Sequence, residues 1–301
     1  MVPDEGVWEG KMIDITPYIK TLTSLNKRGF ELIGIAVALY YLSALIYALR
    51  WKVVLNAIGK NIPIIELLRI TLSSIFVNNV TPMSRGGGEI LRITWVAKKY
   101  KIPVAISTVS IVYERILEIF PIIFLAVMGI SYFAHHAILI ILSLFLVAVI
   151  VWLNWEKIVI LSFKLLKIKL SHEELVNLLS LRKRASLTMM GVGLSFLVWF
   201  LDIMRLKVIA LAFSWNPSIK FLAIISLANL IFGLMAFTPG GIGIVEGGLI
   251  GTLVYFGIPS TLAISITLIE RFISYVMSSA VGFATLVVSG GAEIWKALKS
   301  H

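Results

Sequence analysis

Two glutamate–arginine dipeptides interrupt long apolar stretches of this sequence and carry its clearest chemical signal. They are Glu114-Arg115 and Glu270-Arg271. A charged side chain at the centre of a bilayer costs about 2.5–3.5 kcal/mol on insertion scales, so all four charges need partners or water. Two interpretations are open: the charges form structural ion pairs, or an arginine is released to bind phosphate when a cavity opens.

Helical geometry predicts which charges pair. Adjacent residues on a helix point about 100° apart, so Glu114 and Arg115 do not pair well with each other. If a pseudo-two-fold axis relates the two dipeptides, Glu114 can meet Arg271 while Glu270 meets Arg115. We therefore predict cross-pairing between the two halves, with Glu118, three residues after Arg115, as a competing local partner.

A polar, glycine-rich box stands where an apolar helix would otherwise continue. It contains Pro82, which removes a backbone donor and disfavours helix at the residue before it. Irregular backbone at membrane depth is tolerated only where protein buries it or water reaches it. The box indicates either a half-helix N-terminus that attracts an anionic headgroup, or a plain interfacial loop. Its candidate binding residues, with those of the following turn, are Asn78, Asn79, Pro82, Arg85, Glu89 and Arg92.

A second box of the same kind follows Thr238. No strand precedes it and no Lys-Ser/Thr follows it, so it does not indicate a nucleotide-binding loop. The spacing of Gly243 and Gly247 predicts close helix packing. Glu246 is the one charge in this stretch, and is either a partnered carboxylate or a proton-coupling group. The candidate binding residues here are Thr238, Pro239, Gly240, Gly241, Gly243 and Glu246.

The remaining polar residues do not indicate catalysis. Asp202 and Arg205 are spaced i, i+3 on one helix face and predict a local salt bridge. His135 and His136 have no carboxylate at metal-ligand spacing, and cysteine is absent. No Ser/His/Asp constellation or paired-carboxylate hydrolase pattern is present. We expect no catalytic centre, no metal site and no cofactor.

The elements that must position these residues are predicted to be membrane helices. The chain has 301 residues, of which 59% are hydrophobic and 14% charged, whereas soluble domains are about 45–50% apolar and 25% charged. Continuous rather than alternating apolar runs favour helices over a β-barrel. The fold class is therefore all-α and polytopic. The apolar segments are 30–49, 62–80, 102–130, 137–155, 187–213, 219–237 and 258–288, with shorter ones at 86–100 and 240–256.

Four landmarks of the first half recur in the second half. Thr81-Pro82 recurs as Thr238-Pro239, Glu89 as Glu246, Ile102-Pro103 as Ile258-Pro259, and Glu114-Arg115 as Glu270-Arg271. The offset of 156 or 157 residues is about half of the chain. A single repeat of this length is typical of transporters built from two copies of one unit.

The two copies are predicted to be inverted. If each Thr-Pro marks the tip of a re-entrant helical hairpin, three segments cross the membrane between the hairpins, which then enter from opposite faces. Of the 27 Lys and Arg residues, 15 are assigned to one side and 5 to the other, and the remaining 7 sit within apolar segments or hairpins. This asymmetry predicts a cytoplasmic C-terminus. The net charge of +11 predicts contact with anionic lipid rather than with nucleic acid.

We expect one multi-pass domain in the cell membrane, with short flanks. An interfacial segment, 1–29, contains a short helix over 12–25, and a cytoplasmic tail covers 289–301. The transmembrane domain covers 30–288, in which repeat 1 is about 62–130, a basic amphipathic linker forming a surface hairpin is 156–186, and repeat 2 is about 219–288.

Several of these residues together resemble a known family. The pattern comprises Arg50-Trp51, Asn79, Pro82, Arg85-Gly86, Gly88-Glu89, Arg92, Glu114-Arg115, the run from Thr238 to Glu246, and Glu270-Arg271. Over roughly residues 30–288 it resembles the membrane domain of lysylphosphatidylglycerol synthase/flippase proteins, of the multiple-peptide-resistance-factor type, and their stand-alone relatives. The resemblance implies lipid translocation between leaflets.

Two departures from this family are visible. The two-part relatives carry a C-terminal cytosolic domain that attaches an amino acid to phosphatidylglycerol, and this chain stops at His301, so we expect that activity to be absent. Members usually begin with a transmembrane helix before the segment that matches 8–29, and no such helix is present in this sequence.

The sequence therefore predicts a lipid flippase rather than an enzyme. Its substrate would be an anionic phospholipid or a polyprenyl-phosphate-linked lipid whose headgroup enters a cavity between the hairpins, where Arg85, Arg115 and Arg271 offset its charge. The repeats then rock to expose the cavity to the other leaflet. Two alternatives stay open, an ion-coupled transporter of a small anion and a non-transporting partner subunit of a membrane enzyme. A homodimer also stays open.

Overall fold

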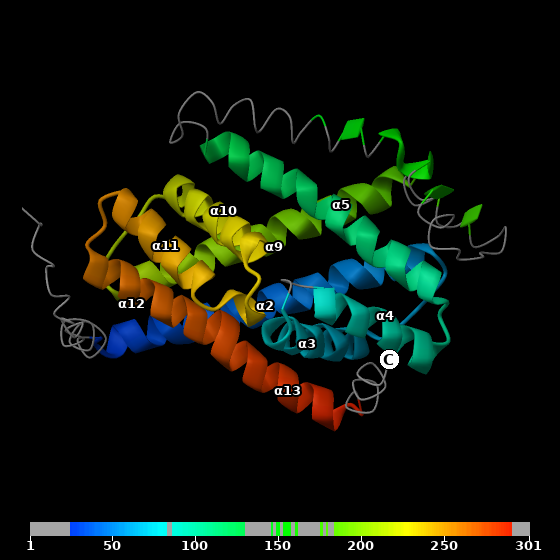
Figure 1. Cartoon of the computed structure of the whole chain (residues 1–301), viewed down its shortest axis with the longest axis horizontal. Helices are drawn as coiled ribbons and strands as arrows, with labels where there is room; N and C mark the ends of the chain where they lie inside the picture. Colours follow the sequence, from blue (N-terminus) through cyan, green and yellow to red (C-terminus); the bar gives the residue numbers. More distant parts are fainter. Residues whose placement is uncertain are drawn as a thin grey trace, which may run out of the picture.

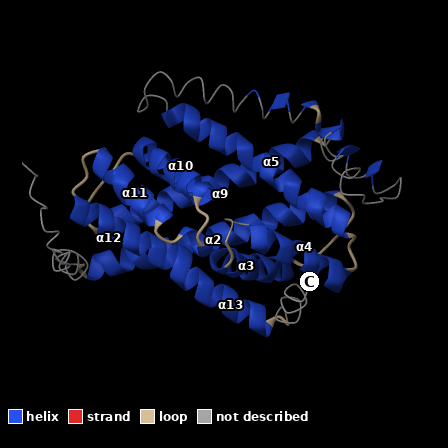
Figure 2. Cartoon of the chain, viewed as in Figure 1, coloured by secondary structure: helices blue, strands red, loops and turns tan. Residues whose placement is uncertain are grey.

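The chain folds into packed helices. The computed structural model describes residues 25–82, 86–129 and 184–290, with the short pieces 146, 149–150, 153–157, 160–161, 175–176 and 179. Every regular element in these ranges is a helix (Figure 2), which confirms the expected all-α class for this part of the chain. The segments expected at 12–25, 137–155 and 156–186 fall wholly or largely outside the described residues.

The helices follow one another along the chain in two similar successions (Figure 1). The first comprises α2 (Lys27–Ala57), α3 (Ile64–Val80), α4 (Gly86–Tyr100) and α5 (Val104–Gly129). The second comprises α9 (Ala185–Ala212), α10 (Ile219–Met235), η3 (Pro239–Gly241), α11 (Ile244–Tyr255), α12 (Ser260–Arg271), η4 (Phe272–Met277) and α13 (Ser278–Val288). In each, a long helix precedes a 17-residue helix, then a short one, then another long segment.

Local sequence explains where several of these helices begin. The Asn26 side chain accepts a 2.8 Å hydrogen bond from the backbone N–H of Gly29 and so caps α2. Ser218 caps α10 in the same way, accepting from Phe221 at 3.2 Å. Pro63 immediately precedes α3, where its missing N–H costs nothing because first-turn amides have no partner inside the helix.

Three helices of the described chain are long and apolar enough to cross a membrane. They are Lys27–Ala57, Ala185–Ala212 and the continuous segment Ser260–Val288, with 31, 28 and 29 residues. At about 1.5 Å per residue each exceeds the roughly 30 Å hydrocarbon core. Large apolar side chains such as Phe200 and Phe283 remain exposed along them. The protein is therefore a multi-pass helical membrane protein.

The two successions are interlocked. Helix α9 packs along α2, and α13 packs along α3 (Figure 1). Gly282 permits the second contact, because a Cβ atom there would lie 2.4 Å from the backbone oxygen of Leu72. On the same side of the molecule, the Asn79 side chain donates hydrogen bonds to Ser278 (3.1 Å) and Ser279 (2.9 Å). The end of α3 is thus fixed to the long helix of the second half.

One element was not predicted from the sequence. The segment expected as a single helix over 258–288 contains a π-helical stretch, Phe272–Met277, directly after Glu270-Arg271. Such widened turns inside α-helices occur frequently at functional sites.

Candidate functional site

The first polar box forms a break between two closely packed helices. Helix α3 ends because Thr81, before Pro82, has extended backbone with ψ 141°. Helix α4 then returns along α3, and the backbone N–H of Gly88 donates a 2.7 Å hydrogen bond to the Asn78 side chain. Only glycine fits there, because a Cβ atom at residue 88 would lie 2.2 Å from the backbone oxygen of Ser74. Arg85 lies outside the described residues.

The second box forms an equivalent break and touches the first. Gly240 has φ +59°, and a Cβ atom there would lie 2.2 Å from the Tyr275 ring and 2.9 Å from the backbone oxygen of Asn79. Gly243 has φ +84° and is the N-cap of α11. These left-handed conformations explain why the box is rich in glycine.

The predicted packing role of the GxxxG pair is wrong. A Cβ atom at Gly243 or Gly247 would meet no atom within 4 Å among the described residues. The close approach is made by the neighbouring Gly248, where a Cβ atom would lie 2.4 Å from the ring of Phe232 on α10. Gly243 instead supplies the left-handed turn before α11.

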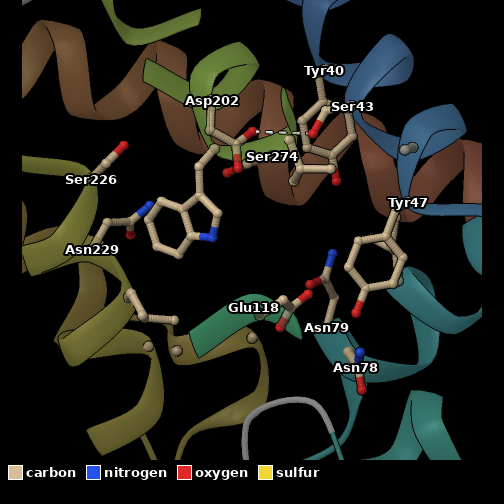
Figure 3. A pocket seen from close by; sticks show the side chains of 18 of the residues that line it. Tyr40, Ser43, Tyr47, Asn78, Asn79, Glu118, Asp202, Ser226, Asn229 and Ser274 are labelled. Atoms are coloured by element: carbon tan, nitrogen blue, oxygen red, sulfur yellow. Dashed lines mark hydrogen bonds between the residues drawn. The ribbon is translucent and has the colours of Figure 1, made fainter. Parts of the chain in front are cut away.

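A polar cavity of about 330 Å³ lies between the two boxes and the long helices. Figure 3 shows Ser226 and Asn229 on one side of it, and Tyr47, Asn78 and Asn79 on the other. The predicted site residues that line it are Asn78, Asn79, Glu89, Arg92, Arg115, Gly240, Gly241, Glu270 and Arg271. The predicted residues Pro82, Glu114, Thr238, Pro239, Gly243 and Glu246 do not line it.

One wall of this cavity was not predicted as part of the site, although the sequence did predict its Asp202–Arg205 salt bridge. It is formed by side chains of α2, α9 and α10: Tyr40, Ser43, Tyr47, Trp199, Asp202, Arg205, Ser226 and Asn229. Single polar or aromatic residues in apolar helices give no periodic signal that could have found this wall.

Glu114 is held between two arginines. Its Oε1 accepts from Nε of Arg50 at 3.4 Å, and its Oε2 accepts a closer hydrogen bond from Arg92. The guanidinium of Arg92 also stacks 4.0 Å from the ring centre of Trp51. None of the side-chain surface of Arg50 or Glu114 is exposed, so this pair is buried behind the cavity wall, to which Arg92 belongs.

Arg115 faces the cavity and is shared by two carboxylates. Its Nε donates to Oε1 of Glu89, and its Nη1 donates to Oε2 of Glu118, both at 2.7 Å. The expected local partner Glu118 is thus confirmed. With 29% of its side chain exposed, Arg115 is the most accessible arginine among the described lining residues.

The second half holds a corresponding set of pairs. Arg205 donates at 3.2 Å both to Glu270 and to Asp202, the latter being the predicted local salt bridge. Arg271 donates at 2.7 Å to Glu246 and to the backbone oxygen of Gly240.

The predicted cross-pairing between the halves is therefore wrong. Each glutamate–arginine dipeptide finds its partners within its own succession of helices. The reason is that arginines on α2 and α9 pair with the two glutamates instead: Arg50 pairs with Glu114, and Arg205 pairs with Glu270. Arg50 and Arg205 are 155 residues apart, close to the repeat offset, and this was the signal that could have revealed them.

No cluster of three metal-ligating side chains occurs among the described residues, and His135 and His136 lie outside them. The site is thus a polar membrane cavity with four arginines and four carboxylates in its described wall.

Comparison with known proteins identifies the family. The model of the lysylphosphatidylglycerol synthase TM region matches residues 10–282. The chain belongs to this family.

Its relatives are membrane proteins of similar length. The chain is 26% identical to the UPF0104 membrane protein MJ1595 of Methanocaldococcus jannaschii, over 92% of this chain and 89% of the relative. It is 27% identical to a UPF0104 membrane protein of Methanothermobacter thermautotrophicus, over 89% and 88% of the two chains. It is 24% identical to the UPF0104 membrane protein PH1989 of Pyrococcus horikoshii, over 87% and 88%. No solved structure matches the chain.

Proposed function

We propose that this protein moves a lipid with an anionic headgroup, a phospholipid or a polyprenyl-phosphate-linked lipid, between the leaflets of the cell membrane. Its membership of the lysylphosphatidylglycerol synthase TM-region family, which is implicated in lipid translocation, supports this proposal.

The observation that carries the proposal is the charged cavity inside an apolar helical domain. Charges at membrane depth are costly, so they are kept where they pair or serve a polar pathway. A volume of about 330 Å³ is at the lower end of ligand cavities, roughly 300–1,000 Å³. It accommodates a headgroup while the tails stay in lipid.

The guanidinium of Arg115 is the proposed first contact for phosphate. It is the most exposed arginine of the described wall, and guanidinium groups bind phosphate through paired N–H donors. A headgroup phosphate would take over the donors that now face Glu89 and Glu118, and Arg271 would contribute from the other half of the cavity.

We propose an alternating-access mechanism based on inverted repeats. The hairpins α3–α4 and α10–α11 would enter from opposite faces as re-entrant elements, and the matched order of helices suggests that each repeat also includes the preceding long helix, α2 or α9. Rocking of one unit against the other would open the cavity to each leaflet in turn. The asymmetry of basic residues supports a cytoplasmic C-terminus.

Native mass spectrometry of co-purifying lipids tests this proposal. We expect acidic lipids to be enriched on the wild type and on the control Arg69→Ala, which removes an exposed arginine outside the cavity, and to be depleted on Arg115→Ala. An unselective lipid mixture that Arg115→Ala leaves unchanged would contradict the proposal. Retention of a small soluble anion in place of lipid would favour the small-anion transporter instead.

A further inference from the structure

Two corresponding glutamates of the cavity region differ in how completely they are paired. Glu114 has an arginine at each carboxylate oxygen, Arg50 at Oε1 and Arg92 at Oε2. Glu270 has Arg205 at Oε1, at 3.2 Å, whereas its Oε2 has no hydrogen-bond partner in the described chain although the residue is only 1% exposed. A buried carboxylate oxygen in this condition has lost its hydration without compensation.

The difference arises from one position on the short returning helices. Arg92 on α4 supplies the second arginine of Glu114, and the repeat offset of 157 residues that relates Glu89 to Glu246 relates Arg92 to Leu249 on α11. The second half thus has leucine where the first half has a positive charge. Glu270 is left with the single arginine of α9.

The charged and titratable groups around Glu270 come from α2, α9, α11 and the neighbouring Arg271. From α9, Arg205 bonds Asp202 as well as Glu270. Tyr40 of α2 lines the same cavity, and the adjacent Arg271 is bound to Glu246 of α11. Glu246, considered from sequence as a proton-coupling group, has both oxygens occupied, one by Arg271 and one by the backbone N–H of Gly243.

The charge balance of the cavity indicates what protonation of Oε2 of Glu270 would achieve. Its described wall carries four carboxylates and four arginines: Glu89, Glu118, Asp202, Glu270, Arg92, Arg115, Arg205 and Arg271. Their formal sum is zero. Protonation of one carboxylate raises the sum to +1, which matches the single negative charge of a phosphodiester headgroup.

We propose that Oε2 of Glu270 binds the coupling proton of transport, one proton with each singly charged anionic headgroup. This inference rests on the function proposed above. Glu270 takes the proton from water on the side of the membrane to which the cavity is open. It releases that proton to water after the cavity has opened to the other side. Ser274 also lies on the cavity wall (Figure 3), and its Oγ has no hydrogen-bond partner in the described chain; we assign it to the water that delivers the proton.

Coupling to one proton determines whether a pH gradient or a membrane potential drives transport. A proton and a monoanionic headgroup move together without net charge, so a pH gradient drives accumulation and a membrane potential does not. For one-to-one coupling, a gradient of about one pH unit supports an unequal leaflet distribution of up to about tenfold.

The experiment uses the full chain in vesicles of phosphatidylethanolamine and phosphatidylglycerol with fluorescently labelled phosphatidylglycerol as the probe. The wild type is expected to accumulate the label in one leaflet under a pH gradient, but not under a potassium-diffusion potential. Glu66→Gln, which removes a carboxylate outside the cavity, should respond as the wild type does. Glu270→Gln, and Leu249→Arg, which supplies the missing arginine, should show no gradient-driven accumulation.

Infrared spectroscopy gives a second readout that does not depend on transport. On acidification the wild type should gain a carbonyl band of a buried protonated carboxylic acid, and Glu270→Gln should lack it while keeping its helical amide bands. A band that persists in Glu270→Gln overturns the assignment. Wild-type protein that equilibrates the label but ignores the pH gradient overturns the coupling and leaves the proposed function standing. Absence of any label movement by wild type and Glu66→Gln overturns both.

Discussion

The Nε of Arg115 donates a 2.7 Å hydrogen bond to Oε1 of Glu89. A bond between the same atoms, with the same length, joins Arg271 to Glu246 in the second half. Each bond connects the short returning helix of a polar box to the long helix that follows it. Both arginines face the cavity, so a phosphate that recruits them would also loosen the contact between those helices.

The first prediction concerns competition between Glu89 and the headgroup. Glu89→Gln removes the carboxylate charge that pairs with Arg115, while the salt bridge to Glu118 still positions the guanidinium. Because the pair is about 29% exposed, we expect it to be worth at most about 1 kcal/mol, and lipid retention to rise up to about fivefold. Lipid occupancy by native mass spectrometry measures this, with Glu66→Gln as the matched control. Reduced retention would show that Glu89 helps to hold the headgroup.

The second prediction concerns the buried group around Glu114. Arg50→Met leaves Glu114 with Arg92 alone and removes the 2.6 Å contact to Glu118. Breaking a buried pair by removing one partner is strongly destabilising, so we expect a loss of about 3 kcal/mol in the free energy of unfolding. Thermal unfolding in detergent measures it. Arg69→Met, at a side chain 47% exposed, should change stability by less than about 1 kcal/mol; equal effects would contradict the buried role.

The third prediction compares the effect on stability of alanine substitution at two adjacent glycines of α11. Gly248→Ala places a methyl group against the Phe232 ring and should cost about 1–3 kcal/mol. Gly247→Ala meets open space and should be neutral or stabilising by up to about 1 kcal/mol, because alanine favours helix. Denaturation of the two variants side by side tests this. The opposite order would restore the GxxxG packing predicted from the sequence.

Much of the fold could be predicted because membrane helices leave a simple signal. Apolar run length predicted α2, α5 and α9, and Pro82 together with the glycines predicted the break between α3 and α4. The spacing of the glutamate–arginine dipeptides also predicted polar groups around a common cavity. These features depend only on local composition and on the cost of charge in lipid.

The partners of the charges could not be predicted in the same way. Cross-pairing required Glu114 and Arg271 to meet, whereas the crossing of α2 with α9 brings Arg50 and Arg205 to the glutamates. That geometry depends on helix packing, which run length does not encode. The π-helical stretch after Arg271, Phe272–Met277, was missed for the same reason, since run length does not distinguish it from the α-helix on either side.

Lipid translocation by this protein is measured most directly by following labelled phosphatidylglycerol between the leaflets of vesicles. Wild-type protein is expected to expose inner-leaflet label to an outer quencher faster than empty vesicles do. Arg115→Ala should slow this movement by about tenfold or more, as loss of a charge-assisted hydrogen bond costs about 1.5–3 kcal/mol, while Arg69→Ala keeps the wild-type rate. Label movement that is the same with wild type, with Arg115→Ala and without protein would show that the protein does not translocate this lipid.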